Sequence, residues 1–432
     1  MTDGITVITD TATLDKYADT WRKADYITVD TEFMRERTFW PQLCLVQVGG
    51  PDESVIIDPL ADGIDLASLF SVLNDEPVLK VFHAARQDIE LFHHMSGHLP
   101  EPLFDTQVAA MVCGFGDSVG YEKLANKLAN ATIDKTLRFT DWSHRPLSDR
   151  QLIYALSDVS HLRLVFEKLS DQLEANGRRE WLDEEMASLL DPAIYAAEPA
   201  RAWRRIKTRG GNKRFFVILE EVAAWREAEA QRRDVPRGRI VKDDAITEIA
   251  AQAPKTVDEL ARIRALSRKT AEGKFGEALL GAVQTALARP ENEWPTPPPR
   301  KETPSGIGPI MDLLKVLLKA QCEKTGVAQK IVANTSDLEK IAALGNDEAA
   351  IDVDTTEIRP LHGWRREMFG ELALALMAGR VALTATRGKI HIIPLDDETA
   401  NFLQAQNEPK RRRRSRKKSS GGADKKAAPE LT

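Results

Sequence analysis

The sequence predicts a mixed α/β domain in the N-terminal part of the chain, followed by α-helical domains. Up to about residue 170, short apolar segments rich in Val and Ile alternate with amphipathic segments, as strands and helices alternate in α/β domains. After about residue 195 the strand pattern nearly vanishes, and residues 203–288 place apolar side chains on one face of consecutive helices. A chain of 432 residues is also too long for one ordinary hydrophobic core.

Five apolar segments have the length and the β-branched composition of strands. Only the residues GGPDE separate the third segment from the fourth, and such a short connection predicts an antiparallel hairpin within the sheet. Because helical segments follow other strands, we expect the sheet to be mixed. The predicted strands are Ile5–Ile8, Tyr26–Phe33, Leu43–Val48, Ser54–Ile57 and Val78–His83.

Helical patterns lie between and after these strands. Asp65 and Ser148 are suitable N-caps, because a short polar side chain can accept a hydrogen bond from a free amide of the first helical turn. Asp105 should cap the helix that follows it in the same way. The predicted helices are Leu14–Ala24, Leu66–Leu73, Gln87–Met95, Thr106–Val112, Glu122–Leu128 and Ser148–Leu169.

The domain boundaries follow from changes in composition. Residues 289–309 contain seven prolines, and since proline removes a backbone donor and disfavours helix before it, this stretch should be a semi-rigid linker. The second helical block should end in a strand-like pair, Val381–Thr384 and Ile390–Ile393. The expected layout is an α/β domain (1–195), a helical domain (203–289), the linker (290–308), a second helical domain (309–395) and a disordered tail (405–432).

The composition is that of a globular protein, with 42% hydrophobic and 29% charged residues. The chain has no run of roughly eighteen apolar residues, and its first ten residues lack the pattern of a secretion signal, so we expect no membrane association. The three cysteines are odd in number and far apart, which excludes a disulfide framework and fits a reducing cytoplasm.

Charge is unevenly distributed along the chain. From Glu408 to the C-terminus, ten Lys or Arg residues stand against three acidic residues, a net charge of +7. Since the whole chain carries −6, residues 1–407 carry −13. An acidic body with a basic tail suits an enzyme that binds metal cations at carboxylates better than a protein that coats nucleic acid. The basic tail either contacts RNA phosphates or is a solvated terminus.

The segment Tyr26–Phe33 carries two acidic residues at the end of an apolar run. Residues two apart in a strand project from the same face, so Asp30 and Glu32 should place their carboxylates about 7 Å apart along the strand. Because desolvating a charge is costly, such a pair calls for a partner, and Mg²⁺ prefers oxygen ligands. Taken alone, the two residues could also be solvent-facing acids at a strand end.

Three further residues complete the candidate site. Asp88 follows the strand that ends at His83 and falls in or near the first turn of a helix, where an acid also interacts favourably with the helix dipole. Tyr154 and Asp158 lie four residues apart on a predicted helix, so their side chains should point to the same place. An ordinary hydrogen bond between these two residues is the structural alternative.

The order and spacing of these residues resemble the DEDD exonuclease superfamily in its tyrosine-bearing branch. The segments DTEFMRERTFWPQLCLVQVG, HAARQDIELF, LFDTQVAA and YALSDVSHL look like the signature segments of ribonuclease D, and the match spans essentially all of residues 5–170. Residues 225–260 resemble an HRDC domain, and residues 309–380 resemble a second one less distinctly. The resemblance implies a ribonuclease H-like exonuclease domain followed by helical HRDC-type domains.

The resemblance also implies a chemistry. Asp30, Glu32, Asp88 and Asp158 would bind two divalent ions, Mg²⁺ or Mn²⁺, and with Tyr154 they would form the catalytic set that releases 5′-mononucleotides from a free 3′ end. Because the ordinary pKa of a phenol is about 10, we expect Tyr154 to orient the attacking water rather than to act as a base.

The substrate follows from the same resemblance. Thr31, Phe33 and Met34 would hold the terminal nucleotide, and His83 would approach its phosphate or sugar unless it is a structural histidine. The expected substrates are transfer RNA precursors and other structured RNAs, and we expect a monomer. The alternatives are a DNA 3′→5′ exonuclease, since related domains process DNA, and a non-catalytic RNA-binding adaptor with the same fold.

Overall fold

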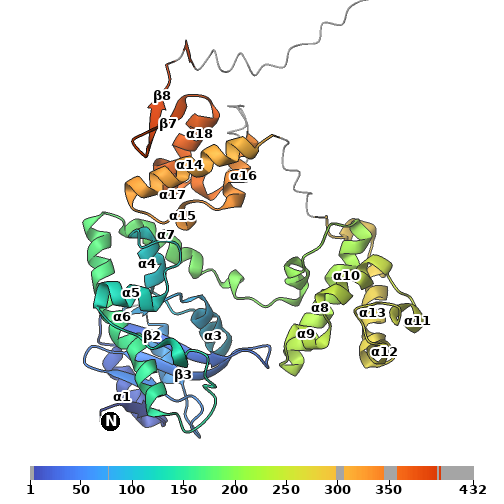
Figure 1. The fold of residues 1–432 in the computed structure, drawn as a ribbon. Helices are drawn as coiled ribbons and strands as arrows, with labels where there is room; N and C mark the ends of the chain where they lie inside the picture. Colours follow the sequence, from blue (N-terminus) through green and yellow to red (C-terminus); the bar gives the residue numbers. More distant parts are fainter. Residues whose placement is uncertain (1–3, 76, 298–305, 345–357, 397, 400–432) are drawn as a thin grey trace, which may run out of the picture. The chain divides into compact units, whose positions relative to one another are not determined.

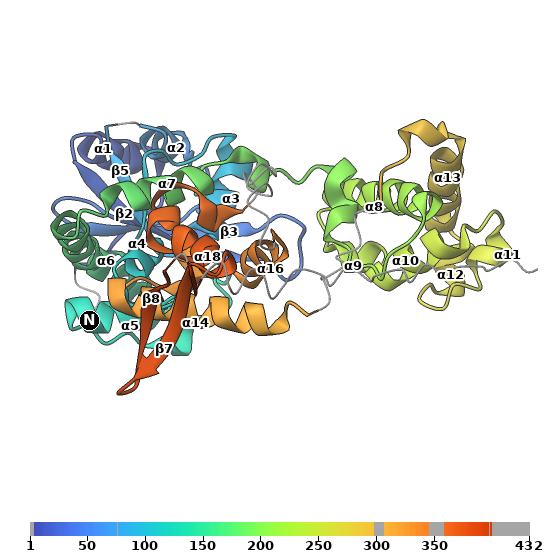
Figure 2. The ribbon, with the colours of Figure 1, turned by 90° about the horizontal axis from the view of Figure 1, so that it is seen from above.

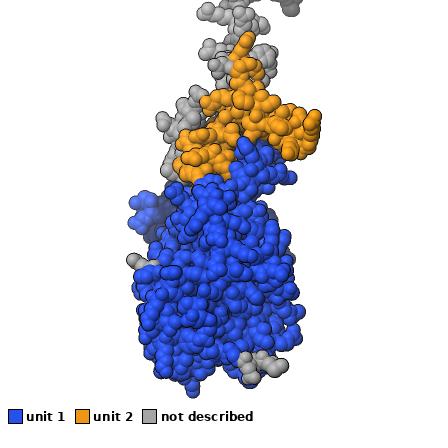
Figure 3. All heavy atoms as spheres, turned by 90° about the vertical axis from the view of Figure 1, so that its left-hand side faces the viewer, with its two compact units in different colours: residues 1–339 blue, residues 340–432 orange. Residues whose placement is uncertain are grey.

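The computed structural model describes residues 4–75, 77–297, 306–344, 358–396 and 398–399. The chain divides into two compact units, residues 1–339 and 340–432, which are coloured separately in Figure 3. The predicted tail from residue 405 and residues 298–305 of the predicted linker lie outside the described residues. Residues expected to form one module, 309–395, fall into both units, so the domain boundaries stay predictions.

The first unit contains a six-stranded mixed sheet in the order β1–β4–β3–β2–β5–β6. Strands β2 and β3 are labelled in Figures 1 and 2. Strand β3 pairs antiparallel with β2 and β4, whereas the pairs β1–β4, β2–β5 and β5–β6 are parallel. The mixed sheet and the hairpin predicted from the sequence are therefore confirmed. The strands are β1 (Thr6–Ile8), β2 (Tyr26–Met34), β3 (Gln42–Gly49), β4 (Ser54–Ile57), β5 (Leu79–Phe82) and β6 (Leu103–Asp105).

Helices pack on this sheet, and the longest of them, α6, lies against β2, β3 and β4. Strand β6 and helix α7 were not predicted. Strand β6 has only two apolar residues, Leu103 and Phe104, which stand between Pro102 and Asp105 and are too short a run to indicate a strand. The helices of this part of the chain are α1 (Thr11–Trp21), α2 (Ala67–Leu73), α3 (Arg86–Ser96), α4 (Thr106–Val112), α5 (Tyr121–Ala129), α6 (Asp149–Ala175) and α7 (Arg179–Leu189).

The predicted caps show how short polar side chains begin these helices. Ser148 caps α6 in a complete capping box with Gln151, and Asp105 caps α4 by accepting a hydrogen bond from the Gln107 amide. Both predictions are confirmed. The cap at Asp65 is displaced by one residue: Leu66 is the N-cap of α2, although the Asp65 carboxylate accepts a 2.9 Å hydrogen bond from the first helical amide.

A helical module follows within the same unit, built around α8, whose apolar residues form the centre of a separate hydrophobic core. Two charged residues of α8 are almost fully buried, and each has a partner: Arg226 pairs with Asp243 at 2.6 Å, and Glu227 pairs with Arg237 at 2.5 Å. The helices are α8 (Lys213–Arg233), α9 (Arg237–Ile240), α10 (Asp243–Gln252), α11 (Val257–Leu260), α12 (Arg268–Ala271) and α13 (Lys274–Ala288).

The described C-terminal part continues with short helices and ends in a hairpin. Strands β7 and β8 pair antiparallel, and the two residues that join them, Arg387 and Gly388, both have positive φ, as the tight turn of a β-hairpin requires. The strand pair predicted here is confirmed. The elements are α14 (Gly308–Thr325), α15 (Gln329–Val332), α16 (Thr335–Leu344), α17 (Gly363–Arg365), α18 (Glu371–Met377), β7 (Val381–Thr386) and β8 (Lys389–Pro394).

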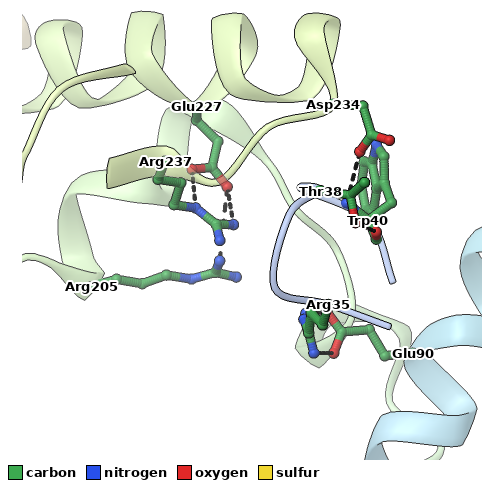
Figure 4. A network of polar contacts seen from close by, with 8 residues as sticks. All are labelled: Arg35, Thr38, Trp40, Glu90, Arg205, Glu227, Asp234 and Arg237. Atoms are coloured by element: carbon green, nitrogen blue, oxygen red, sulfur yellow. Dashed lines mark hydrogen bonds and ion pairs between the residues drawn. The ribbon is translucent and has the colours of Figure 1, made fainter. Parts of the chain in front are cut away.

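The β2–β3 loop lies between the sheet domain and the helical module (Figure 4). On the module side, one carboxylate oxygen of Asp234 accepts hydrogen bonds from the amides of Phe39 and Trp40, each at 3.0 Å. The Arg237 guanidinium lies 4.3 Å from the centre of the Phe39 ring. On the sheet side, Trp40 stacks on His94 of α3 with ring centres 3.8 Å apart. The loop is thus held from both sides.

We expect Asp234 to fix this loop through hydrogen bonds rather than through its conformation. Asp234 has a φ of 48°, which Gly and Asn both tolerate, but only Asn keeps an acceptor oxygen. Asp234→Gly should therefore speed hydrogen exchange at the amides of Phe39 and Trp40 by about tenfold, whereas Asp234→Asn should change it little. Exchange at these amides that is as slow in Asp234→Gly as in the wild type would contradict this role.

Candidate active site

The site begins where α6 approaches β2 most closely. The Thr28 hydroxyl of β2 donates a 2.9 Å hydrogen bond to the carbonyl of Val159, in the interior of α6. Opposite Thr28 in the sheet lies Gly49, where a Cβ would come within 2.3 Å of the Thr28 hydroxyl and 3.3 Å of the Val159 carbonyl. The close approach of helix and strand therefore depends on the missing side chain at position 49.

This approach brings three predicted acids together. Asp30 and Glu32 follow Thr28 at alternate positions of β2, so they project toward the same face of the sheet. Asp158 precedes Val159 on α6 and is 8% exposed. One carboxylate oxygen from each of Asp30, Glu32 and Asp158 lies within 4.8 Å of the other two. The acids are therefore close enough to share a cation.

The electrostatics of this group are unfavourable when its carboxylates are ionised. Burial raises the pKa of Asp30 to about 6. For Asp158, burial and then the charge of Asp30 raise the pKa to about 8. Burial also raises the pKa of Glu32, and the neighbouring carboxylates raise it further. Without a cation, Asp158 and Glu32 therefore hold protons at neutral pH that isolated carboxyls would have lost, whereas Asp30 is mostly ionised.

Asp88 is the fourth acid and lies beside this group rather than within it. It stands in the first turn of α3, as predicted, and is 7% exposed. The Thr31 hydroxyl donates a hydrogen bond to its carboxylate, which fixes the orientation of Asp88. Burial and the charge of Asp30 raise the pKa of Asp88 well above its ordinary value.

Tyr154 lies one helical turn before Asp158, as the sequence predicted. Its ring stacks on the buried Trp142, with ring centres 6.0 Å apart and planes at 29°. Burial raises the pKa of the phenol, and the charges of Asp158, Glu32 and Asp30 raise it further. The phenol is therefore neutral at physiological pH and can donate a hydrogen bond.

These residues line a cleft of about 590 Å³, within the size range of small-molecule sites. All five predicted catalytic residues lie in it, as do the predicted substrate residues Thr31, Phe33 and His83. Met34 is not among the lining residues; its side chain packs beside the core cluster that contains Cys44 and Leu45.

His83 has one ring nitrogen engaged and one without a partner. Its Nδ1 lies 3.0 Å from the Thr106 hydroxyl, which itself donates to the Phe82 carbonyl at 2.9 Å. Nδ1 must therefore be the donor in the pair with Thr106. Burial lowers the pKa of His83, which favours the neutral ring, so Nε2 is left as an acceptor. An acceptor suits a hydroxyl better than a phosphate.

Sequence reasoning missed other residues that line the cleft, among them Gln107, Tyr121, Lys123 and Arg138. Tyr121 begins α5, and its hydroxyl donates to the Ser157 carbonyl beside Asp158 at 3.1 Å. These residues come from α4, α5 and the loop before α6, and no short motif joins them to the acids. Only the packing of these elements on the sheet brings them to the cleft.

Comparison with known proteins agrees with this geometry. A family model described as a 3′-5′ exonuclease matches residues 5–174, and one described as an HRDC domain matches residues 215–283. The curated protein Ribonuclease D of Gluconacetobacter diazotrophicus is 48% identical over 388 residues, 90% of this chain and 96% of that protein. Ribonuclease D of Granulibacter bethesdensis is 47% identical with the same coverage of both chains.

A solved structure extends the comparison to the fold. The crystal structure of Escherichia coli RNase D, described as an exoribonuclease involved in structured RNA processing, aligns with a TM-score of 0.74 at 28% identity. The alignment covers 86% of this chain and 99% of that one. The expected exonuclease domain with a mixed sheet, followed by a helical HRDC domain, is confirmed. The chain belongs to the ribonuclease D family.

Proposed function

We propose that this 3′→5′ exoribonuclease hydrolyses RNA from a free 3′ end and releases 5′-mononucleotides with the help of two divalent ions. The observation that carries the proposal is the gathering of Asp30, Glu32 and Asp158 within 4.8 Å, with Asp88 beside them. Four acids in one cleft repel each other when ionised, and bound cations remove that repulsion. The oxygen ligands suit hard ions such as Mg²⁺ or Mn²⁺.

The four acidic side chains have the role of binding the ions. When bound, two divalent ions would polarise the phosphate and lower the pKa of the attacking water. Asp30, Glu32, Asp88 and Asp158 hold these ions, and Thr31 keeps Asp88 in position.

Tyr154 orients the attacking water. Its phenol is neutral, so it can donate a hydrogen bond but is a poor base. The stack on Trp142 holds the ring of Tyr154 in place, in the cleft that the carboxylates also line.

The substrate-binding roles rest on the shape and polarity of the cleft. Thr31 and Phe33 line it, and we assign these two residues to the terminal nucleotide; for Met34, which does not line the cleft, this role rests on the family resemblance alone. The free Nε2 of His83 is an acceptor, and we assign it to a ribose hydroxyl.

The biological setting follows from the relatives. The E. coli relative is described as an exoribonuclease involved in structured RNA processing, and we propose that this chain likewise trims transfer RNA precursors and other structured RNAs. We further propose that it acts as a monomer in the cytoplasm, where its three free cysteines would stay reduced. No helix among the described residues is long and apolar enough to span a membrane.

One set of assays tests the activity. The protein is incubated with matched RNA and DNA oligomers, with free or blocked 3′ ends, in Mg²⁺, Mn²⁺ or EDTA. We expect mononucleotides only from RNA with a free 3′ end and only with metal, and Asp30→Asn should lose at least about 100-fold in kcat. Activity on blocked ends would refute the exonuclease, preference for DNA would favour a DNA exonuclease, and inactivity on both polymers would favour a non-catalytic adaptor.

The role of Tyr154 predicts a loss of turnover without a loss of binding. Tyr154→Phe keeps the ring on Trp142 but removes the hydroxyl, so kcat should fall by roughly 10- to 100-fold while KM for RNA and the affinity for Mg²⁺ stay near the wild-type values. Steady-state kinetics and a Mg²⁺ titration measure both effects. Undiminished kcat in Tyr154→Phe would exclude the proposed role.

The raised carboxyl pKa values predict how stability depends on pH and metal. In the metal-free protein the folded state binds protons more tightly than the unfolded state, in which the pKa of Asp is about 3.9. These groups therefore favour folding at low pH, and that contribution is lost as pH rises toward the pKa of about 8 at Asp158. Divalent ions bind the ionised carboxylates, so Mg²⁺ should raise the melting temperature little at pH 5 and much more at pH 8.

The matched control is Asp158→Asn, which removes one carboxyl with a raised pKa and one proposed metal ligand. The increase in melting temperature on adding Mg²⁺ should therefore become smaller, and it should depend less on pH. Because groups elsewhere contribute equally with and without Mg²⁺, the difference between the two melting temperatures isolates the site. An equal increment at pH 5 and pH 8 in the wild type would show that these acids do not bind the ions.

A further inference from the structure

Phe139 is the most exposed large apolar side chain among the described residues. It is 90% exposed, whereas the next, Ile153, is 51% exposed. An aromatic ring this exposed contributes little to the hydrophobic core, since it stays in contact with water. Its place in the fold therefore suggests a task other than stability.

A tight turn holds Phe139 at its tip. The amide and the hydroxyl of Thr140 both donate to the Leu137 carbonyl, at 3.1 and 2.9 Å. Such a bond between residues three apart closes a β-turn whose two central residues are Arg138 and Phe139. The two central residues lie at the tip of the turn, and both are exposed.

The turn is attached to the start of α6, the helix that carries Tyr154 and Asp158. The Gln151 side chain of the capping box donates to the Thr140 hydroxyl at 3.4 Å. Next to it, Arg150 pairs with Asp134 at 2.9 Å, just before the turn. The turn thus keeps a fixed position relative to the catalytic residues of α6.

Arg138 links the turn to the cleft. It lines the cleft together with the four acids, and its charge lowers the pKa of both Glu32 and Asp158. Its guanidinium carbon lies 5.4 Å from the centre of the Phe139 ring. The Arg138 cation, which lines the cleft with the acids, is therefore next to the solvent-exposed ring of Phe139.

We propose that Arg138 and Phe139 form a binding platform for an unpaired nucleotide of the RNA 3′ strand, with the base stacked on Phe139 and the adjacent phosphate bound by Arg138. The inference rests on the proposed exoribonuclease function. Once divalent ions neutralise the acids, Arg138 is available to a phosphate. A single RNA strand offers a phosphate beside a base with a free face, which matches a cation beside a free ring.

The platform selects for strand state rather than for sequence. Every base has an aromatic face, so stacking on Phe139 tolerates all four bases. A base inside a duplex is already stacked on its neighbours and cannot lie on the ring. The enzyme should therefore degrade a single-stranded 3′ overhang and slow at the edge of a stem.

The test uses the full-length protein and RNA hairpins with a 3′ overhang, in which single abasic nucleotides replace successive overhang positions. Phe139→Ala and Phe139→Leu should each raise KM for the intact overhang roughly 5- to 150-fold with little change in kcat. Phe139→Trp should keep the wild-type KM, because its ring can still stack on a base. In the wild type, an abasic nucleotide at one overhang position should raise KM as much as Phe139→Ala does. In Phe139→Ala, the same abasic nucleotide should raise KM no further. Leu60→Ala, at a 38% exposed residue outside the cleft lining, is the control and should match the wild type.

Arg138 has its own readout. Arg138→Gln should lower the slope of log KM against log salt concentration by about 0.7, the value for one phosphate contact on a single strand.

Wild-type KM in Phe139→Leu, or abasic effects that add fully to Phe139→Ala, would overturn the platform while leaving the exoribonuclease activity intact. A change in oligomeric state of Phe139→Ala at unchanged KM would likewise overturn it and assign Phe139 to a protein interface. Failure of the wild type to degrade the intact overhang would instead count against the proposed function.

Discussion

The mutual repulsion of carboxylates gathered in one cleft is the constraint that the structure around the candidate site has to meet. Asp30, Glu32 and Asp158 come from a strand and a helix far apart in the sequence, and their oxygens lie within 4.8 Å of one another. Ionised groups at this distance oppose folding unless cations or protons join them. The capping box of α6, the stack under Tyr154 and the hydrogen bond from Thr31 to Asp88 all hold the acids against that repulsion. The surrounding scaffold is therefore as much a part of the site as its ligands.

The sequence was sufficient for five of the six strands of the sheet and for choosing the five candidate residues that the structure places in one cleft, because these depend on local patterns. The alternation in Tyr26–Phe33 and the four-residue spacing of Tyr154 and Asp158 are visible in one dimension. Strand β6 was missed because its two apolar residues, Leu103 and Phe104, are too short a run to indicate a strand. Tyr121 and Arg138 were missed because tertiary packing alone brings α5 and the turn before α6 to the cleft. The Nε2 of His83 is an acceptor because Nδ1 donates to Thr106, and no sequence spacing relates Thr106 to His83.

The helical module has a physical connection to the catalytic strand. The β2–β3 loop begins where β2 ends, two residues after Glu32, and its backbone amides are held by Asp234 of the module. Arg237, which covers Phe39, is itself fixed by the buried Glu227 (Figure 4). A displacement of the module would therefore pull on the strand that carries Asp30 and Glu32. The HRDC domain is in this way joined through the β2–β3 loop to the strand that enters the cleft.

The absent side chain at Gly49 has a consequence for how genetic variants of this enzyme are interpreted. Position 49 is outside the cleft lining, yet a methyl group there would meet the Thr28 hydroxyl at 2.3 Å and the Val159 carbonyl at 3.3 Å, so the hydrogen bond between these two groups would have to shift. A missense change from glycine to alanine is among the mildest by chemical similarity, and scoring schemes based on such similarity would pass it as neutral. Here it would disturb the hydrogen bond that joins β2, which carries Asp30 and Glu32, to α6, which carries Asp158. A substitution that is mild by chemical similarity can therefore reach the acids of the cleft through the space that a glycine leaves between a strand and a helix.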